Sequence, residues 1–328
     1  MGNELKMKVI VHIGYPKAGS TLLQKHIFKN IPNLRVDGVE ASRCNLELIC
    51  ELSQQKPNSS VIEDNLKKFY VDESKPLLIS HEHFLLPYSN DTELKERFFN
   101  DCKREGFFYN KSCDFELMSS NIKQFIPSVK LIVILRSQYD ILLSEFAHRL
   151  RENVHPWNLF SRLEEYVLEN HQAKNYEVLL NILYLNWNKN DVWVSSLELI
   201  SERTQAEELS LSEFIESGIK FNFNTPENKG EYAKNKIKYK SVFYRLSKVK
   251  DRSFFINRSI SDWIYYRIFM SNIFGKIIKN YCTLIYGNKN LKLEKTSKLK
   301  PILDEYKEIN KRVEKAINKT LHIQLDEN

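Results

Sequence analysis

Four short apolar runs, spread over the first two hundred residues, constrain the fold most strongly. They cover residues 7–13, 76–80, 129–135 and 191–195. Each run is rich in Val, Ile and Leu and too short for a buried helix, and helix-length segments separate the runs. This alternation predicts an α/β domain with a central parallel sheet and flanking crossover helices. Ligands of such sheets bind beyond the carboxyl ends of the strands.

Apolar residues spaced four apart predict helices after the first and third runs, with Pro32 ending the first helix and Asp140 as the N-cap of the second. A longer helical region is expected from about residue 157 to 190. The apolar positions are Leu23, Ile27 and Ile31 in the first helix, Leu142, Phe146 and Leu150 in the second, and Leu163, Val167, Leu179, Leu183 and Trp187 in the long region.

The composition changes at Pro226, after which Lys and Arg are dense and interleaved with aromatic residues. We therefore predict one domain over residues 1–328, with an α/β core in 1–225 and a helical C-terminal extension in 226–328. Residues 301–321 have amphipathic helical spacing. Its apolar positions are Ile302, Tyr306, Ile309, Val313 and Ile317.

Composition indicates a globular protein of the cytosol. Hydrophobic residues make up 42% of the chain and charged residues 28%. The five cysteines form no C-x-x-C pair, which disfavours a zinc ribbon or a disulfide framework and favours a reducing compartment. The charged start runs directly into the first apolar run, so we expect no signal peptide and a cytoplasmic location. The net charge of +7 favours anionic ligands.

A glycine-bracketed loop follows the first predicted strand, in the sequence VIVHIGYPKAGSTLLQ. Gly14 and Gly19 bracket four residues and are followed by Ser20 and Thr21, which is nearly the phosphate-binding spacing G-x-x-x-x-G-K-[ST]. Backbone N–H groups, a helix N-terminus and two hydroxyls predict a phosphate site. The Lys of that pattern is displaced to Lys17 inside the loop, so it need not hold a β/γ-phosphate pair.

A second candidate phosphate site lies in VKLIVILRSQYDILLSEF. Arg136 comes at the carboxyl end of the third predicted strand, and Ser144 lies one to two turns into the next helix. An Arg can bind a terminal phosphate through two hydrogen bonds, and a hydroxyl adds a further donor. Taken alone, Arg136 is equally compatible with a solvated or helix-capping role.

Together, the two segments resemble the sulfotransferases that use the sulfuryl donor PAPS. PKAGSTLLQ resembles their 5′-phosphosulfate loop, P-K-x-G-T-T-x-L/W, and RSQYDILLSEF resembles their 3′-phosphate motif, R-x-x-x-D-x-x-x-S-x-[YF]. The resemblance implies a P-loop NTPase-like three-layer α/β/α fold and a reaction without an obligatory metal, leaving PAP. It implies that the 5′-phosphosulfate is bound by Pro16, Lys17, Ala18, Gly19, Ser20 and Thr21, and the 3′-phosphate by Arg136 and Ser144.

The sequence departs from that family at two points. Leu22 stands where cytosolic members often carry an aromatic residue, so adenine stacking must come from elsewhere. The later R-K-G-x-x-G element is reduced to residues 228–230, which leaves Lys229 as a candidate phosphate contact.

A catalytic base is expected from PLLISHEHFLLP, where His81, Glu82 and His83 follow the second predicted strand. In an extended segment, His81 and His83 point to one side and Glu82 to the other. The S-x-E pattern resembles that of glycan-acting sulfotransferases. Glu82 is therefore the first candidate for the base, and His81 is the second. A metal site on the two histidines and a purely structural role are the alternatives; His12 and His148 are interpreted as packing or surface residues.

The leading hypothesis is therefore a sulfotransferase whose acceptor is a hydroxyl of a saccharide or glycolipid. A P-loop kinase is the runner-up, although it requires Lys in place of Ser20 and an acidic Mg²⁺ ligand where Arg136 stands. A third hypothesis is a membrane- or nucleic-acid-binding module in the basic C-terminal region. We expect that region to cover the acceptor site, with a peripheral membrane contact as a further hypothesis and no nucleic acid as partner.

Overall fold

The computed structural model describes residues 8–14, 23–28, 31, 33–35, 39–70, 75–88, 92–126, 128–151, 163–202, 205–216 and 299–323. Contacts divide the chain into two compact units. The first comprises Met1–Ile141, Asn170–Thr225 and Pro301–Asn328, and the second comprises Leu142–Glu169 and Pro226–Lys300. Among the described residues, no helix combines the length and the apolar character needed to cross a bilayer.

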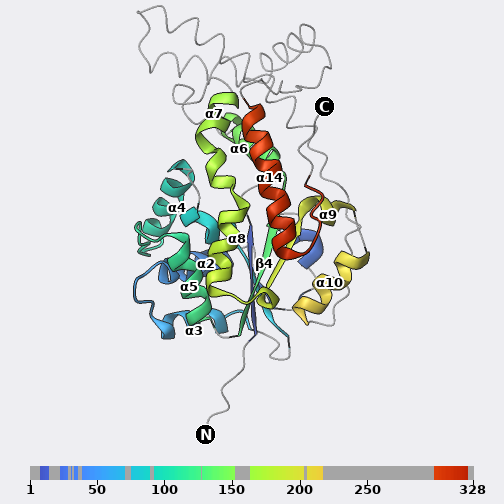
Figure 1. The fold of residues 1–328 in the computed structure, drawn as a ribbon. Coiled ribbons are helices and arrows are strands. Elements are labelled where there is room, and N and C mark those ends of the chain that lie inside the picture. Colours follow the sequence, from blue (N-terminus) through green and yellow to red (C-terminus); the bar gives the residue numbers. More distant parts are fainter. Residues whose placement is uncertain are drawn as a thin grey trace, which may run out of the picture. The chain divides into compact units, whose positions relative to one another are not determined.

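The first unit is built on one parallel sheet of five strands in the order β2-β3-β1-β4-β5 (Figure 1). The α/β fold predicted from the apolar runs is confirmed, and the four runs form β1, β3, β4 and β5. The strands are β1 (Val9–Gly14), β2 (Asn33–Arg35), β3 (Leu77–Ser80), β4 (Val129–Leu135) and β5 (Val192–Ser196).

The short edge strand β2 was not predicted because its three residues, Asn33–Arg35, form no apolar run. It pairs with β3, and the side-chain amide of Asn33 donates a hydrogen bond to the carbonyl of Lys75 at 2.9 Å. A buried polar contact therefore fixes this strand where an apolar pattern is missing.

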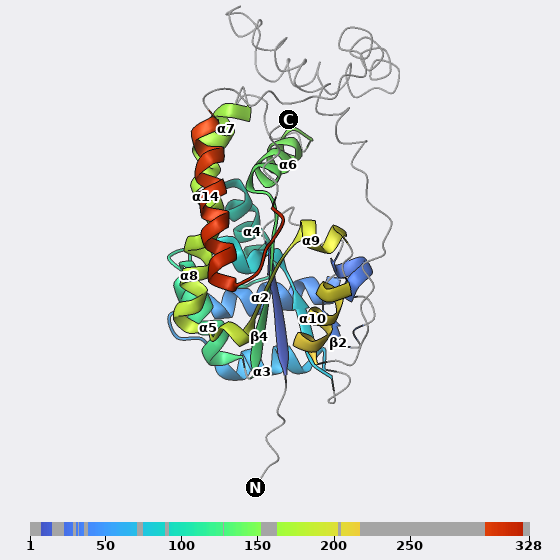
Figure 2. The ribbon, with the colours of Figure 1, turned by 45° about the vertical axis from the view of Figure 1, so that its right-hand side comes forward.

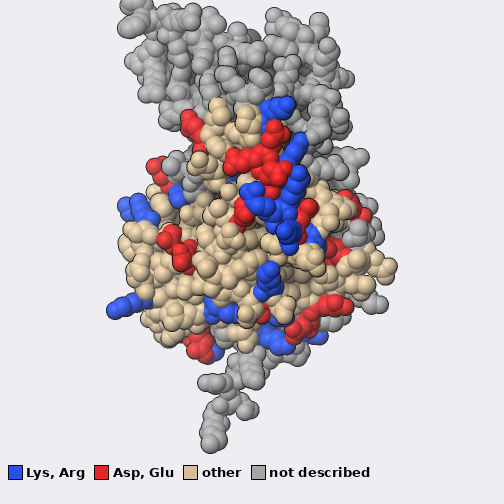
Figure 3. Space-filling model, viewed as in Figure 1, with Lys and Arg blue, Asp and Glu red and all other residues tan. Residues whose placement is uncertain are grey.

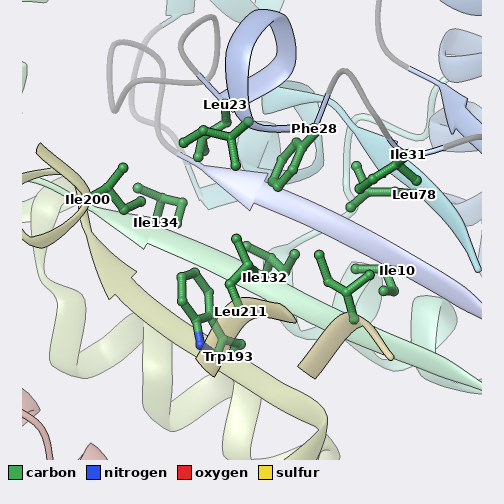
Figure 4. Close-up of a cluster of buried hydrophobic side chains, with 12 residues drawn as sticks. Ile10, Leu23, Phe28, Ile31, Leu78, Ile132, Ile134, Trp193, Ile200 and Leu211 are labelled. Carbon is green, nitrogen blue, oxygen red and sulfur yellow. The ribbon is translucent and has the colours of Figure 1, made fainter. Parts of the chain in front are cut away.

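Helices cover both faces of the sheet, which is why its strands are apolar on both sides. On one face lie η1 (Leu23–Ile27), α9 (Leu197–Glu202) and α10 (Gln205–Ile215), packed on a core that includes Ile10, Ile132 and Trp193 (Figure 4). The opposite face carries α5 (Phe115–Phe125) and α8 (Tyr176–Asn186) (Figure 2). The adjoining elements are α2 (Val39–Leu52), α3 (Ser59–Lys67), η3 (Glu82–Tyr88), α4 (Thr92–Arg104) and η5 (Lys189–Asp191).

Two predicted helices differ from the structure near the sheet. The first begins as the π-helix η1 and ends at Ile27, so Ile31 lies beyond it. The second is α6 (Gln138–Arg151), whose N-cap is Ser137 rather than Asp140. The Ser137 hydroxyl accepts a hydrogen bond from the Asp140 N–H at 3.3 Å, which places Asp140 inside the first turn.

The predicted long helical region consists of α7 (Leu163–Asn170), the 3₁₀ turn η4 (His171–Lys174) and α8. Asn175 separates η4 from α8 because its side-chain oxygen accepts hydrogen bonds from the N–H groups of Glu177 and Val178, at 3.1 and 3.2 Å. An asparagine N-cap inside an apolar pattern therefore starts a new helix.

The C-terminal helix α14 (Lys300–Ile317) confirms the predicted amphipathic segment but ends before Leu321. Asn318 adopts the left-handed conformation (φ 53°), and the Lys319 N–H bonds the Glu314 carbonyl, so the chain leaves the helix there. The outer face of α14 mixes acidic and basic side chains, among them the ion pair of Lys311 and Glu308 (Figure 3).

In the second unit, the described residues form the end of α6 and α7. The Tyr166 hydroxyl donates to the Glu145 carboxylate at 3.2 Å, and the Phe146 ring packs on the Tyr166 ring with centroids 5.7 Å apart. A buried aromatic contact and a hydrogen bond therefore join these two helices.

Candidate functional site at the carboxyl edge of the sheet

The strand order places a topological switch point at the carboxyl end of β1. The crossover after β1 contains η1, on one face of the sheet, whereas the crossover from β4 to β5 contains α8, on the other. Connections that leave neighbouring strands toward opposite faces open a crevice where such sheets bind ligands. The switch point therefore lies between the ends of β1 and β4.

The two candidate phosphate motifs start at these two strand ends. Gly14 closes β1 and pairs in register with Ile134 of β4, and Arg136 follows two residues later. The loop that begins after Gly14 and the Arg136 segment thus leave neighbouring strands at the same edge of the sheet. The predicted elements on either side of the loop, β1 and the helix from Leu23, are both present.

Several predicted site residues lie outside the described residues, and their roles stay predictions. They are Pro16, Lys17, Ala18, Gly19, Ser20, Thr21 and Lys229. The basic and aromatic region of residues 226–298 lies outside them as well, as do the side chains of Glu82 and His148.

Arg136 is fixed through its backbone by a buried tyrosine. The Tyr176 hydroxyl donates to the Arg136 carbonyl at 2.5 Å, and the Arg136 N–H lies 3.4 Å from the same hydroxyl oxygen. The guanidinium is about a quarter exposed and lies 4.0 Å from the Asp140 carboxylate. The end of β4 therefore has a fixed backbone and a side chain that solvent still reaches.

A carboxyl group lies beside Arg136 at the start of α9. The Glu198 carboxylate accepts the Ser137 N–H at 2.9 Å, while its second oxygen is buried without a hydrogen-bond partner among the described residues. Burial raises the pKa of Glu198, and the nearby Arg136 works in the opposite direction. The edge between β4 and β5 thus combines a guanidinium with a poorly solvated acid.

Ser144, the predicted partner of Arg136, is half-buried on α6 and belongs to the second unit. Its joint use with Arg136 stays a prediction.

The segment that carries the candidate base is not extended. The strand ends at Ser80 and the 3₁₀ helix η3 starts at Glu82, which overturns the expected alternation of sides. His81 and His83 nevertheless lie together, with ring centroids 4.7 Å apart, and the His83 N–H donates to the His81 Nδ1 at 3.3 Å. The turn begins directly after the strand, so a period of two cannot continue into it.

His83 is half-buried and packs against an aromatic ring. Its ring lies 4.8 Å from the Phe98 ring of α4, and its Nδ1 is buried without a hydrogen-bond partner among the described residues. Burial lowers the pKa of His83 to about 4, and the Asp101 charge opposes this shift only in part. His83 is therefore neutral at physiological pH.

A buried polar cluster links β1, β3 and η1 behind the candidate base. The His12 Nδ1 and the Ser80 hydroxyl are 2.6 Å apart, and the Gln24 amide donates to the Ser80 hydroxyl and carbonyl at 3.1 and 3.2 Å. Burial lowers the pKa of His12 to about 3, so its ring is neutral. This cluster ties the helix after the phosphate loop to the residue before the His81 triplet.

Sequence reasoning missed three residues of this edge: Gln24, Tyr176 and Glu198. Tyr176 and Gln24 lie inside helices, where no pattern distinguishes them from packing or surface residues. Glu198 could have been found by the reasoning applied to Arg136, since it comes two residues after the end of a buried strand. Within the described parts of the chain, no group of three or more His, Cys, Asp or Glu side chains is placed to hold a metal ion.

Solved structures to which this chain is similar include two sulfotransferases. No protein family and no curated protein matches the sequence. A sulfotransferase from Alicyclobacillus acidocaldarius aligns over 73% of this chain and 91% of its own, at 10% identity and a TM-score of 0.43. A mouse sulfotransferase in complex with PAP aligns over 84% of this chain and 88% of its own, at 12% identity and a TM-score of 0.35.

Proposed function

We propose that this protein is a sulfotransferase that moves a sulfuryl group from PAPS to a hydroxyl acceptor. The observation that carries the proposal is the register of β1 and β4, which brings Gly14, where the candidate phosphate loop begins, to the same switch point as Arg136. A donor with phosphate groups at two positions suits two phosphate-binding segments at a single crevice. PAPS has a 5′-phosphosulfate and a 3′-phosphate.

In this proposal, the loop after β1 holds the 5′-phosphosulfate. The backbone from Pro16 to Gly19 and the hydroxyls of Ser20 and Thr21 supply hydrogen-bond donors, as the sequence pattern predicts. Lys17 stabilises the negative charge that develops on the leaving phosphate. Arg136 and Ser144 bind the 3′-phosphate, and Lys229 is a further candidate contact.

Glu82 is the first candidate for the base that accepts the acceptor's proton, and His81 the second. A base works best when its pKa lies near the working pH. His83, with a pKa of about 4, is poorly suited to that role. The backbone N–H of residue 83 donates to the His81 Nδ1 and orients that imidazole, so this contact does not depend on the His83 side chain.

The kinase alternative needs an acidic Mg²⁺ ligand at the end of a strand next to the phosphate loop. The neighbouring strand β4 ends at Leu135 and is followed by Arg136. A cation at this position suits a phosphate better than a metal ion. We therefore favour sulfuryl transfer without an obligatory metal.

For the acceptor, we propose a saccharide or glycolipid hydroxyl, acted on in the cytoplasm. The support is the Ser80–Glu82 pattern, S-x-E, together with the net charge of +7, which suits acidic glycans. The C-terminal region would cover this acceptor and, in a variant of the proposal, contact an anionic membrane surface.

The test is transfer of ³⁵S from labelled PAPS to a mixture of saccharides and glycolipids. Lys17→Ala should lower the rate by about 100-fold or more, because one group that stabilises the leaving phosphate is lost. Lys8→Ala is the matched control, since Lys8 precedes the opposite end of β1 and pairs with Glu216 at 2.7 Å. Full transfer by Lys17→Ala would overturn the proposal. PAP binding without transfer to a glycan would overturn only the proposed class of acceptor.

A further inference from the structure

Two cysteine side chains from different helices meet in the first unit. The sulfur atoms of Cys50 on α2 and Cys102 on α4 lie 3.2 Å apart, and the residues are 3% and 2% exposed. The four described cysteines are all free thiols. Because 52 positions separate the pair, no C-x-x-C pattern could reveal it.

Hydrogen bonds connect the chain around Cys50 to neighbouring segments. The Cys50 carbonyl accepts from the Ser53 hydroxyl and the Gln54 amide, each at 2.7 Å. The same Gln54 amide donates to the Phe108 carbonyl, and the Ser53 hydroxyl accepts the Asn110 N–H, both at 2.9 Å. The end of α2 is therefore tied to the loop that follows α4.

Cys102 occupies a capped helix end. The Phe107 N–H donates to the Cys102 carbonyl at 2.8 Å, and Gly106 adopts the left-handed conformation that such a cap requires (φ 81°). Both thiols thus lie in the last turns of their helices. Helix ends open more readily than helix centres, which gives a small oxidant access to an otherwise buried pair.

The two thiols play unequal parts in their contact. Cys50 donates its S–H to the Cys102 sulfur, and this hydrogen bond lowers the pKa of Cys102 while it raises that of Cys50. Cys102 is therefore the nucleophile of the pair, and Cys50 is the thiol that resolves its oxidised form.

We propose that Cys50 and Cys102 form a redox pair that hydrogen peroxide converts reversibly into an intramolecular disulfide. The Cys102 thiolate attacks one peroxide oxygen, the O–O bond breaks, and hydroxide leaves to become water. The Cys50 sulfur then attacks the sulfenic acid, the S–O bond breaks, and a second water forms with the Cys50 proton. Two thiols and one peroxide give one disulfide and two waters, and the sulfurs must approach by about 1.2 Å.

The pair lies next to the candidate site without belonging to it. Phe98, one helical turn before Cys102 on α4, packs on the His83 ring at 4.8 Å. A disulfide would tie that helix covalently to α2. The thiol chemistry requires no sulfuryl transfer, so the inference stands or falls independently of the proposed function.

The experiment treats the folded full-length protein with hydrogen peroxide, blocks the remaining thiols with iodoacetamide, and maps disulfides by peptide mass spectrometry. We expect a peptide pair linked through Cys50 and Cys102 as the main product, abolished by dithiothreitol. Cys44→Ala should leave this link unchanged, because Cys44 is a buried thiol of the same helix with no sulfur contact among the described residues.

Thermal melting gives a second readout. Peroxide should raise the melting temperature of the wild type in a manner reversed by dithiothreitol, because the link restricts the unfolded chain. Cys102→Ala and Cys50→Ala should lose that response. The proposal is overturned if the link is no more abundant in folded than in urea-unfolded protein, or if Cys102 accumulates as sulfinic acid beside a free Cys50. The mass readout on the wild type needs no variant to fold.

Discussion

The buried hydroxyl of Tyr176 donates a hydrogen bond to the carbonyl oxygen of Arg136, so the first residue of α8 holds the residue that follows β4. Burial keeps the pKa of Tyr176 well above its usual value, and the phenol therefore stays a donor at physiological pH. Arg136, whose side chain is proposed to bind the 3′-phosphate, thus has a backbone that is held by a residue of α8.

Tyr176→Phe should weaken both folding and PAP binding. The Arg136 carbonyl loses the hydrogen bond from Tyr176, which costs about 1–3 kcal/mol in the free energy of unfolding. We expect the Kd for PAP to rise about tenfold, measured by titration calorimetry beside urea unfolding. Tyr306→Phe is the control, since it removes a similarly buried hydroxyl that donates to His171 at 2.8 Å. Equal losses of PAP affinity in both variants would contradict the positioning role of Tyr176.

Gln24→Met should weaken the attachment of η1, the helix after the candidate phosphate loop, to the sheet. The variant keeps the length of the side chain but loses the two hydrogen bonds to Ser80, so η1 is no longer tied to β3. A stability loss of about 1 kcal/mol is expected, together with weaker PAP binding. Gln54→Met, which loses hydrogen bonds at the end of α2, should lower stability without changing the Kd for PAP. Unaltered PAP binding in Gln24→Met would argue against this coupling.

The sheet was predictable because β1, β3, β4 and β5 are buried on both faces and therefore read as uninterrupted apolar runs. Helix boundaries were harder to predict, since single side chains decide them. Ser137 caps α6 in place of Asp140, and Asn175 starts α8 within an apolar pattern. Such caps compete with equally good candidates nearby in the sequence, and only the folded backbone selects among them.

His83→Phe should reduce the acid sensitivity of the fold. The pKa of His83 in the folded protein, about 4, lies below the value near 6.5 of the unfolded chain, so the unfolded state binds more protons between these pH values. The free energy of unfolding of the wild type therefore falls as the pH drops from 6.5 to 4, by an amount on the order of 3 kcal/mol from this residue.

The measurement is urea unfolding at pH 7, 5.5 and 4.5. His83→Phe keeps the ring against Phe98 and should have a shallower pH dependence than the wild type. Phe115→Leu disturbs the buried contact with the Tyr88 ring without removing a titratable group or a neighbour of His83, so it should lower stability by a similar amount at each pH. An unchanged slope in His83→Phe would show that the histidine does not titrate in this way.

Gln138 and Asn310 form a reciprocal pair of buried amides that joins the start of α6 to α14, with hydrogen bonds of 2.6 and 3.1 Å. Gln138→Leu alone leaves the Asn310 amide unpaired and should cost about 1–3 kcal/mol. The double variant with Asn310→Leu should lose less than the sum of the single losses. Additive losses would contradict the coupling.

Breaking the exposed ion pair of Lys311 and Glu308 on the same helix should cost at most about 1 kcal/mol.

The candidate site was predictable only where a charged or titratable residue comes shortly after a buried strand. Arg136 and the His81 triplet follow buried strands, which is where ligands of parallel sheets bind. Tyr176 and Gln24 act through hydrogen bonds to residues 40 and 56 positions away, which no local spacing records. The turn after Ser80 also had no signal, and for this reason the expected alternation of His81, Glu82 and His83 was wrong.

The most direct test of the proposed donor compares the affinities of PAP and AMP, which differ in the 3′-phosphate, by titration calorimetry. We predict that the wild type binds PAP about 100-fold more tightly than AMP, and that Arg136→Met brings the two Kd values close together with little change for AMP. Arg312→Met, on the exposed face of α14 and paired with Glu177, should keep the wild-type ratio. Equal affinity of the wild type for PAP and AMP, or tighter binding of ATP with Mg²⁺ than of PAP, would contradict the account.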